Sequence, residues 1–186
     1  MKSLGPVIAI ALVGATPADA QSMHHAIPPL SSGRMVATPL STEVFLGKVV
    51  AAAQFEMQAA QLAAEKSQNP ALKQLADRMI RDHTAANEDL RRTISGDPNA
   101  ELPQDPQLPE EMALKLKQLQ NDWGKEFDAK FIEMMTDGHK KDADLFRYYD
   151  ANGPDPMLKI FARRTLPIIE GHLRDLEALQ KSVKSS

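Results

Sequence analysis

The sequence predicts an all-α protein: an antiparallel four-helix bundle, built from two helical hairpins that a long proline-rich crossover joins. Apolar residues recur every three or four positions through most of residues 41–183, which is the period of an amphipathic helix. Ala, Leu, Met, Glu, Lys and Gln, all good helix formers, are plentiful. Clusters of Pro, Gly and Asn divide the helical pattern into segments, and no segment shows the alternation typical of a strand.

The first predicted hairpin contains helices over about 42–66 and 70–94. Ser41 is a suitable N-cap for the first helix, because its hydroxyl can accept a hydrogen bond from the first turn. Asn69 and Pro70 give the second helix an N-cap and a proline at its first position. Since so few residues connect the two helices, they are expected to run antiparallel.

The second predicted hairpin follows a loop over 96–109 that contains four prolines. Such a loop suits a crossover between hairpins. The helical pattern then resumes over 110–149, and Gly124 can divide it into a short helix and a long one. Asn152-Gly153-Pro154 ends this helix, and a last helix is expected over about 158–179.

Residues 1–20 resemble a secretory signal peptide. Lys2 supplies the positive charge, Leu4–Val13 form a short apolar run, and Ala18-Asp19-Ala20 matches a small-x-small cleavage site. The apolar run is too short for a transmembrane anchor. We therefore expect a periplasmic protein with no anchor after cleavage, a flexible leader over 21–40 that carries His24-His25, and a helical domain over 41–183.

Composition and missing motifs exclude several functions. The net charge of -3 and the pI of about 6.0 give no positive surface for nucleic acid. The chain has no cysteine, which excludes disulfides, thiolate metal sites and cysteine catalysis. It also has no glycine-rich phosphate loop, G-x-S-x-G or H-E-x-x-H sequence. A non-enzymatic role is favoured, and the sequence leaves open whether the protein forms homo-oligomers.

Four polar residues occupy helix positions where the pattern otherwise places Leu, Met, Phe or Ala: Glu56, His83, His139 and His172. A buried carboxylate is costly unless a cation or hydrogen-bond donors surround it. Imidazole and carboxylate are ligands of Zn, Fe, Mn and Cu. The pattern therefore suggests a transition-metal site in the bundle interior.

Counting residues from the turns tests whether these side chains share one level. Glu56 lies 13 residues before Asn69 and His83 lies 14 after it, so at about 1.5 Å per residue the two are level. In the second hairpin His139 lies 14 residues before Gly153 and His172 lies 19 after it, which leaves a mismatch of about 7 Å.

Two further residues and a proline complete the prediction. Pro167 is expected to kink the last helix, which together with long side chains can absorb the mismatch. Asp142, three residues beyond His139, is a fifth metal-ligand candidate or an orienting partner of that histidine. Glu170 lies two residues before His172 and should point away from the site.

The motifs at these positions resemble a known bacterial family, the domain of unknown function 4142, which is described as ferritin-like. The resemblance spans about Thr42 to Leu179. It is carried by Phe45-Leu46, Glu56, Ala76-x-x-Met79-x-x-Asp82-His83, Phe127-Asp128, His139-Lys140-Lys141-Asp142 and Leu166-Pro167-x-x-x-x-His172. It implies a ferritin-like bundle of the cell envelope with no assigned biochemical activity.

Three functions remain open at this point. The first is metal binding through the five candidate residues, in the context of envelope stress or metal handling. The second is a metal-free structural or interaction protein, in which the same groups form a buried polar network. The third is an oxidase or peroxidase. A ferritin-type di-iron centre is disfavoured, because Ile80 and Ile169 stand where Glu-x-x-His pairs would need glutamate.

Overall fold

The computed structural model describes residues 40–96, 102 and 107–184. They form five α-helices: α1 (Thr42–Lys66), α2 (Pro70–Ile94), α3 (Glu110–Asn121), α4 (Gly124–Asn152) and α5 (Pro156–Lys184). The predicted all-α class is confirmed, and no strand occurs in this part of the chain. The expected signal peptide, leader and His24-His25 lie outside the described residues.

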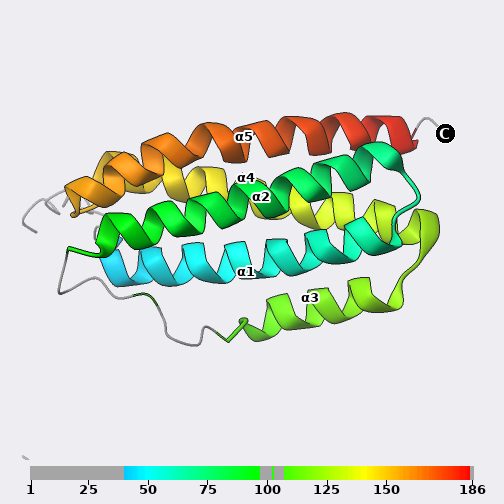
Figure 1. The fold of residues 1–186 in the computed structure, drawn as a ribbon, viewed down its shortest axis with the longest axis horizontal. Helices are drawn as coiled ribbons and strands as arrows, with labels where there is room; N and C mark the ends of the chain where they lie inside the picture. Colours follow the sequence, from blue (N-terminus) through cyan, green and yellow to red (C-terminus); the bar gives the residue numbers. More distant parts are fainter. Residues whose placement is uncertain (1–39, 97–101, 103–106, 185–186) are drawn as a thin grey trace, which may run out of the picture. The chain divides into compact units, whose positions relative to one another are not determined.

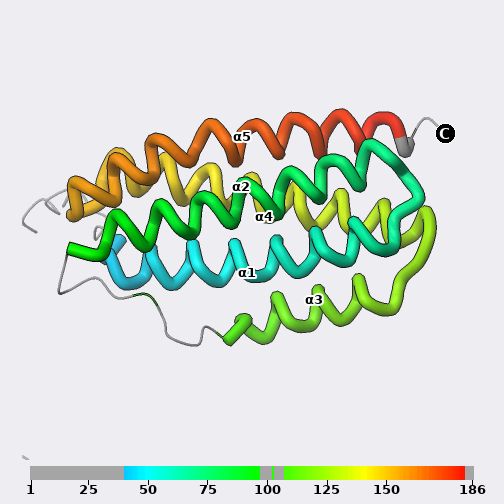
Figure 2. The backbone as a smooth tube through the Cα atoms, in the orientation of Figure 1, coloured from blue at the N-terminus to red at the C-terminus, as the bar shows by residue number. Residues whose placement is uncertain are grey.

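Four long helices lie side by side, and the short helix α3 lies along α1 (Figure 1). Consecutive helices run in opposite directions, as the colour gradient along the backbone shows (Figure 2). After α2 the chain returns along the bundle through helix α3 before α4 begins (Figure 1). The crossover therefore contains a helix and not a loop alone. The division of 110–149 at Gly124 is therefore confirmed.

Helix boundaries follow the predicted capping residues. The Ser41 hydroxyl accepts a hydrogen bond from the Val44 amide at 3.3 Å, and Asn69 Oδ1 accepts from the Ala71 amide at 3.0 Å. Asp155 Oδ1 accepts hydrogen bonds from the first turn of α5. This helix begins at Pro156, about two residues before the start that the sequence predicts. Each cap accepts from amide groups that have no partner inside the helix.

The junction between α3 and α4 is held by a lysine from α1. Lys66 Nζ donates to the carbonyl oxygens of Leu119, Gln120 and Asp122 and lies 4.1 Å from the ring centroid of Trp123. Orphan carbonyls at a helix end favour such a cation. Gly124 has φ 56°, a left-handed conformation that favours glycine, and so permits the sharp turn into α4.

The apolar interior is divided into two clusters. One contains Phe127, Phe131 and Met135 near the α3–α4 junction, and the other contains Phe45, Phe146 and Phe161 near the opposite end. On every long helix the polar candidate lies between residues of the two clusters, as His139 does between Met135 and Ala143. The four candidates thus form one polar layer across the bundle.

Candidate metal centre

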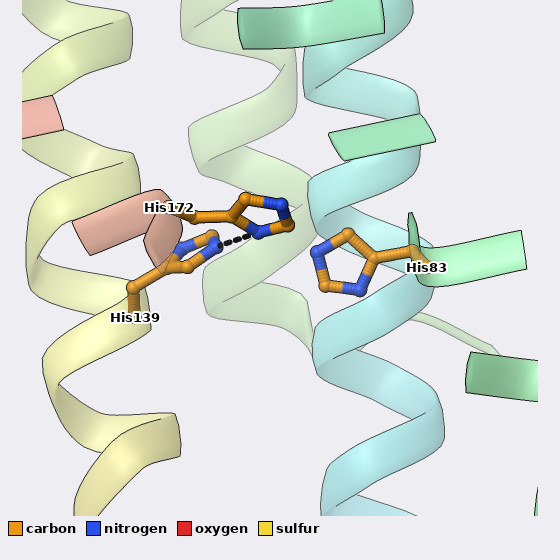
Figure 3. A group of neighbouring side chains, drawn as sticks. All are labelled: His83, His139 and His172. Atoms are coloured by element: carbon orange, nitrogen blue, oxygen red, sulfur yellow. Dashed lines mark hydrogen bonds between the residues drawn. The ribbon is translucent and has the colours of Figure 1, made fainter. Parts of the chain in front are cut away.

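The polar layer takes one residue from each long helix: Glu56 from α1, His83 from α2, His139 from α4 and His172 from α5. Glu56, His139 and His172 are 2%, 0% and 1% exposed, and the His83 side chain is 12% exposed. The three imidazoles face one another (Figure 3), with ring centroids 5.4–5.9 Å apart. One nitrogen from each ring lies within 4.8 Å of the others.

Glu56 lies against two of these rings. Its Oε1 is 2.9 Å from His139 Nδ1 and its Oε2 is 3.1 Å from His83 Nε2. Both contacts have the distance of an ion pair, but neither has hydrogen-bond geometry, so neither carboxylate oxygen accepts a well-formed hydrogen bond from the two histidines. A carboxylate in this position is costly unless positive charge lies next to it.

His139 and His172 meet through nitrogens that both present lone pairs. His139 Nδ1 lies 3.0 Å from the Met135 carbonyl oxygen, an acceptor, so this nitrogen carries the proton. His172 Nε2 lies 2.8 Å from the Asp82 carboxylate and carries a proton for the same reason. Neutral rings in these tautomers leave lone pairs on His139 Nε2 and His172 Nδ1, which are 3.3 Å apart. Such a contact requires a shared cation or an extra proton.

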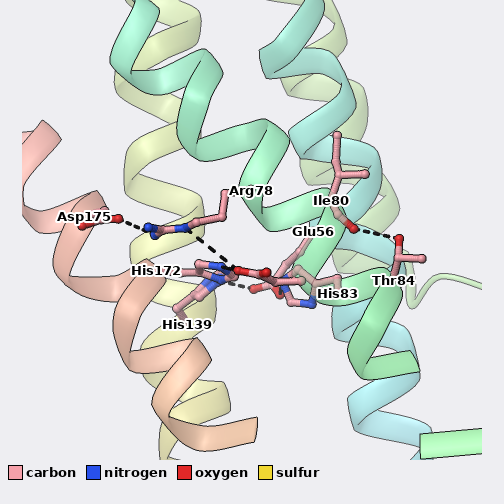
Figure 4. A network of polar contacts seen from close by, with 9 residues as sticks. Glu56, Arg78, Ile80, His83, Thr84, His139, His172 and Asp175 are labelled. Carbon is pink, nitrogen blue, oxygen red and sulfur yellow. Dashed lines mark hydrogen bonds and ion pairs between the residues drawn. The ribbon is translucent and has the colours of Figure 1, made fainter. Parts of the chain in front are cut away.

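The far side of His172 is held by charged residues (Figure 4). Asp82 accepts its hydrogen bond, and Arg78 Nε lies 4.0 Å from the same carboxylate oxygen. Arg78 also donates to Asp175 on α5. Asp82 therefore sets the tautomer of His172 and leaves Nδ1 as the available ligand atom.

The charges of this layer shift its pKa values in opposite directions. Burial alone would raise the pKa of Glu56, but the charges of His139 and His83 lower it well below its usual range. Burial opposes the charged form of His139, yet the Glu56 carboxylate holds the pKa of that imidazole above its ordinary value. Burial lowers the pKa of His172 to about 4, so this ring is neutral near pH 7.

Asp142 takes a different position from the other four candidates. It is partly buried and lines a small cavity of about 30 Å³ together with Glu56 and His83, but it is not part of the histidine group. Burial and the negative charge of Glu56 raise the pKa of Asp142 well above its ordinary value. Glu170, predicted to point away, pairs at 2.7 Å with Arg147 on the surface.

Sequence reasoning missed Asp82 and Arg78 as parts of the site. Asp82 directly precedes His83, so it points about 100° around α2 from that histidine and toward α5. The sequence offers one signal for Asp82, namely an acidic residue directly before a core histidine. It becomes informative only when the neighbouring helix is known, because Asp82 contacts the histidine of α5 and not the adjacent His83.

The donor set is chemically suited to a metal ion such as Cu²⁺ or Zn²⁺. Imidazole nitrogens are good ligands for both, and an adjacent carboxylate offsets the charge. Two nitrogens bound at about 2.0–2.1 Å in tetrahedral geometry lie roughly 3.3 Å apart. The observed separation of His139 Nε2 and His172 Nδ1, 3.3 Å, agrees with this value. The buried Glu56 carboxylate, which accepts no well-formed hydrogen bond from the histidines beside it, is the second observation in favour of a cation.

Fold and site together define a helical-bundle protein with a buried carboxylate–histidine layer. The chain belongs to the family described as Domain of unknown function (DUF4142), whose model matches residues 28–179. The expected family is therefore confirmed. No curated protein matches the chain.

A solved structure described as "CopM in the Cu(II)-bound form" has a similar fold. It is 17% identical, with a TM-score of 0.66, over 78% of this chain and 99% of that chain. At this identity the similarity supports the bundle fold alone. Among the described helices, none is long and apolar enough to cross a membrane.

Proposed function

We propose that the protein is a periplasmic metal-binding protein that holds one transition-metal ion in its polar layer. His83, His139 and His172 would supply nitrogen ligands, and Glu56 would supply negative charge beside them. The contact that carries the proposal is His139 Nε2 to His172 Nδ1, because two lone pairs at 3.3 Å need either a metal ion or an extra proton between them, and a metal ion satisfies both rings at once. The predicted signal peptide supports the compartment.

Copper is the first ion to test, and zinc the second. Divalent ions bind N and O sites with affinities that rise to a maximum at Cu²⁺. The fold shared with a protein solved in a Cu(II)-bound form adds a reason to begin there. The ion would supply positive charge next to the imidazoles of His139 and His172 and the carboxylate of Glu56. Asp82 would keep the His172 ligand atom free of its proton.

The test is elemental analysis and Cu²⁺ or Zn²⁺ titration of protein purified without a His tag. We expect about one equivalent per chain and a rise in Tm with added metal. His139→Ala should abolish the bound metal while the helical circular dichroism persists. The control is the double variant His24→Ala, His25→Ala, which removes the leader histidines and should bind as the wild type does. Less than about a tenth of an equivalent, with no change in Tm, contradicts the proposal.

A metal-free polar network is the second candidate, and the raised pKa of His139 favours it. In that state His139 is an imidazolium that donates from Nδ1 to the Met135 carbonyl oxygen and from Nε2 to His172 Nδ1, and its charge balances the Glu56 carboxylate. The network would then fix helix register through charge. Nitrogen NMR of the His139 ring separates the two candidates. In metal-free protein an imidazolium shows two protonated ring nitrogens, whereas a metal-bound ring shows one.

A further inference from the structure

A large pocket lies between α1, α3 and α4, outside the polar layer. Its volume is about 600 Å³ and it is partly open to the surface. Apolar side chains of Phe55, Met112 and Met134 line much of its wall. Nothing in the function proposed above uses this space.

The inner end of the pocket reaches the polar layer. Glu56 and Asp142 line the pocket, and the same two residues line the cavity of about 30 Å³ that His83 also borders. A cavity of this size accommodates roughly one water molecule or ion. The two carboxyl groups and Ala52 line both spaces and therefore lie between the large pocket and the small cavity that adjoins His83.

The exposure of the histidines indicates from where else an ion can approach them. His139 and His172 are almost fully buried, and the outer nitrogen of His172 is occupied by Asp82. His83 is 12% exposed and offers the competing approach, from the α2 side. Glu56 is nine-tenths buried or more, accepts no well-formed hydrogen bond from His83 or His139, and borders the pocket.

Small residues keep the pocket wall open toward Glu56. Gly138 lines the pocket, and a Cβ built there would lie 3.2 Å from Glu56 Oε1, so the carboxylate is reached directly past this glycine. Gly47 lines the outer part, where an added Cβ meets nothing within 4 Å. Ala51 also faces the pocket.

The charge along the pocket suits a cation at its inner end. Three lysines line the wall: Lys115 pairs with Glu111 at 2.6 Å, Lys141 pairs with Asp137 at 2.8 Å, and Lys48 lies on α1. Because Lys115 and Lys141 have acidic partners of their own, neither forms an ion pair with Glu56 or Asp142 in the described part of the chain. A buried carboxylate at the end of an open pocket attracts a divalent cation.

We propose that this pocket is the access route by which a divalent metal ion reaches the histidines, with Glu56 and Asp142 as the inner gate. The inference rests on the proposed metal binding. Filling a passage raises the barrier between the free and bound states without changing either state. Rates of uptake and release should therefore fall by the same factor, while the Kd stays constant.

The test is rapid mixing of the full chain with Cu²⁺, followed by visible absorption of the bound ion, together with release to excess EDTA. The double variant Gly47→Leu, Ala51→Leu narrows the passage, and we expect uptake and release about tenfold slower with Kd within about twofold of wild type. Gly47→Ala is the matched control, since it raises helix propensity without filling the pocket, and should keep the wild-type rates.

Met112→Ala provides an independent variant, because it widens the same wall and should accelerate both rates. Wild-type rates in the double variant, or slower rates in Met112→Ala, would overturn the route and leave the metal site in place, pointing to access beside His83. Absence of Cu²⁺ uptake by the wild type would overturn the proposed function, and the route with it.

Discussion

The two ends of the polar layer, at His172 and at Glu56, differ in how their charged groups are stabilised. At one end His172 is hydrogen-bonded to Asp82, which is paired in turn with Arg78, and these partners are partly exposed on the surface. At the other end Glu56 is fully buried and contacts two histidines at ion-pair distance, without a well-formed hydrogen bond from either. The His172 end is fixed by a hydrogen bond to a carboxylate, and the Glu56 end depends on positive charge.

This difference indicates where function is concentrated. A satisfied hydrogen bond holds a ligand atom in one tautomer and needs nothing more. A buried carboxylate without donors is stable only while a proton on histidine or a metal ion balances it. The pocket between α1, α3 and α4 reaches the Glu56 end, whereas Asp82 covers the His172 end. The Glu56 end is therefore the responsive one.

The largest expected effect is that of Glu56→Ala on stability. Removal of one member of a buried charged pair leaves the other uncompensated, which costs about 3–5 kcal/mol. We expect a loss of about 3 kcal/mol in the free energy of unfolding of the metal-free protein, measured by urea denaturation near pH 7. Glu56 is 2% exposed, so solvent screening is small.

The control for Glu56 is another paired glutamate at the surface. Glu170 contacts Arg147 at 2.7 Å with side chains 35% and 51% exposed. Exposed ion pairs contribute about 0–1 kcal/mol, so Glu170→Ala should have little effect. Equal losses in the two variants would show that burial does not distinguish the Glu56 contacts.

The next effect concerns Asp82, the fixed end. Asp82→Asn keeps the size of the side chain but removes the charge that holds the proton on His172 Nε2. Loss of an outer partner of a ligating histidine lowers metal affinity about 10–100-fold, and we expect a value near the lower limit because Asp82 is 34% exposed. The measurement is Cu²⁺ titration at fixed pH.

Asp175→Asn is the matched control for Asp82. Asp175 also contacts Arg78 but does not touch a histidine in the described structure, so its substitution should leave the affinity within about twofold. If both variants weaken binding equally, the effect comes from Arg78 rather than from the tautomer of His172.

Both hairpins turn over three residues, 67–69 and 153–155, and the two level counts differed in which residue of the turn they used. The first count used Asn69, the last residue of its turn. Glu56 and His83 were predicted to be level and do meet. In the second hairpin the count used Gly153 as the turning point, but the chain spends residues 153–155 between α4 and α5. Measured from the helix ends, the mismatch of His139 and His172 falls to about 4–5 Å, which the side chains span.

Other parts of the site could not be predicted from one sequence. Asp82 contacts His172 on a different helix, and helix pairing around the bundle decides that contact. The pocket depends on where α3 lies against α1, and the segment before α3 carries no pattern that fixes this position. Residue spacing predicts which side chains share a face, but it does not predict how neighbouring faces are rotated.

The smallest effect comes from two glycines, one near each end of the layer. Both lie inside helices, where replacement by alanine stabilises by about 0.8–1.0 kcal/mol if space permits. Gly171 on α5 has space, since an added Cβ lies 3.8 Å from Arg174 Nη2. Gly138 on α4 has less, because its Cβ would lie 3.2 Å from Glu56 Oε1.

We therefore expect Gly171→Ala to raise the free energy of unfolding by about 0.5–1 kcal/mol without changing metal affinity. Gly138→Ala should gain less, because Glu56 must move by a few tenths of an ångström against His139 and His83, and its Cu²⁺ affinity should fall several-fold. Urea denaturation and metal titration of both variants provide the comparison. A gain in stability with unchanged affinity in Gly138→Ala would mean that the Glu56 carboxylate can shift freely, and that the responsive end of the layer is less constrained than its contacts indicate.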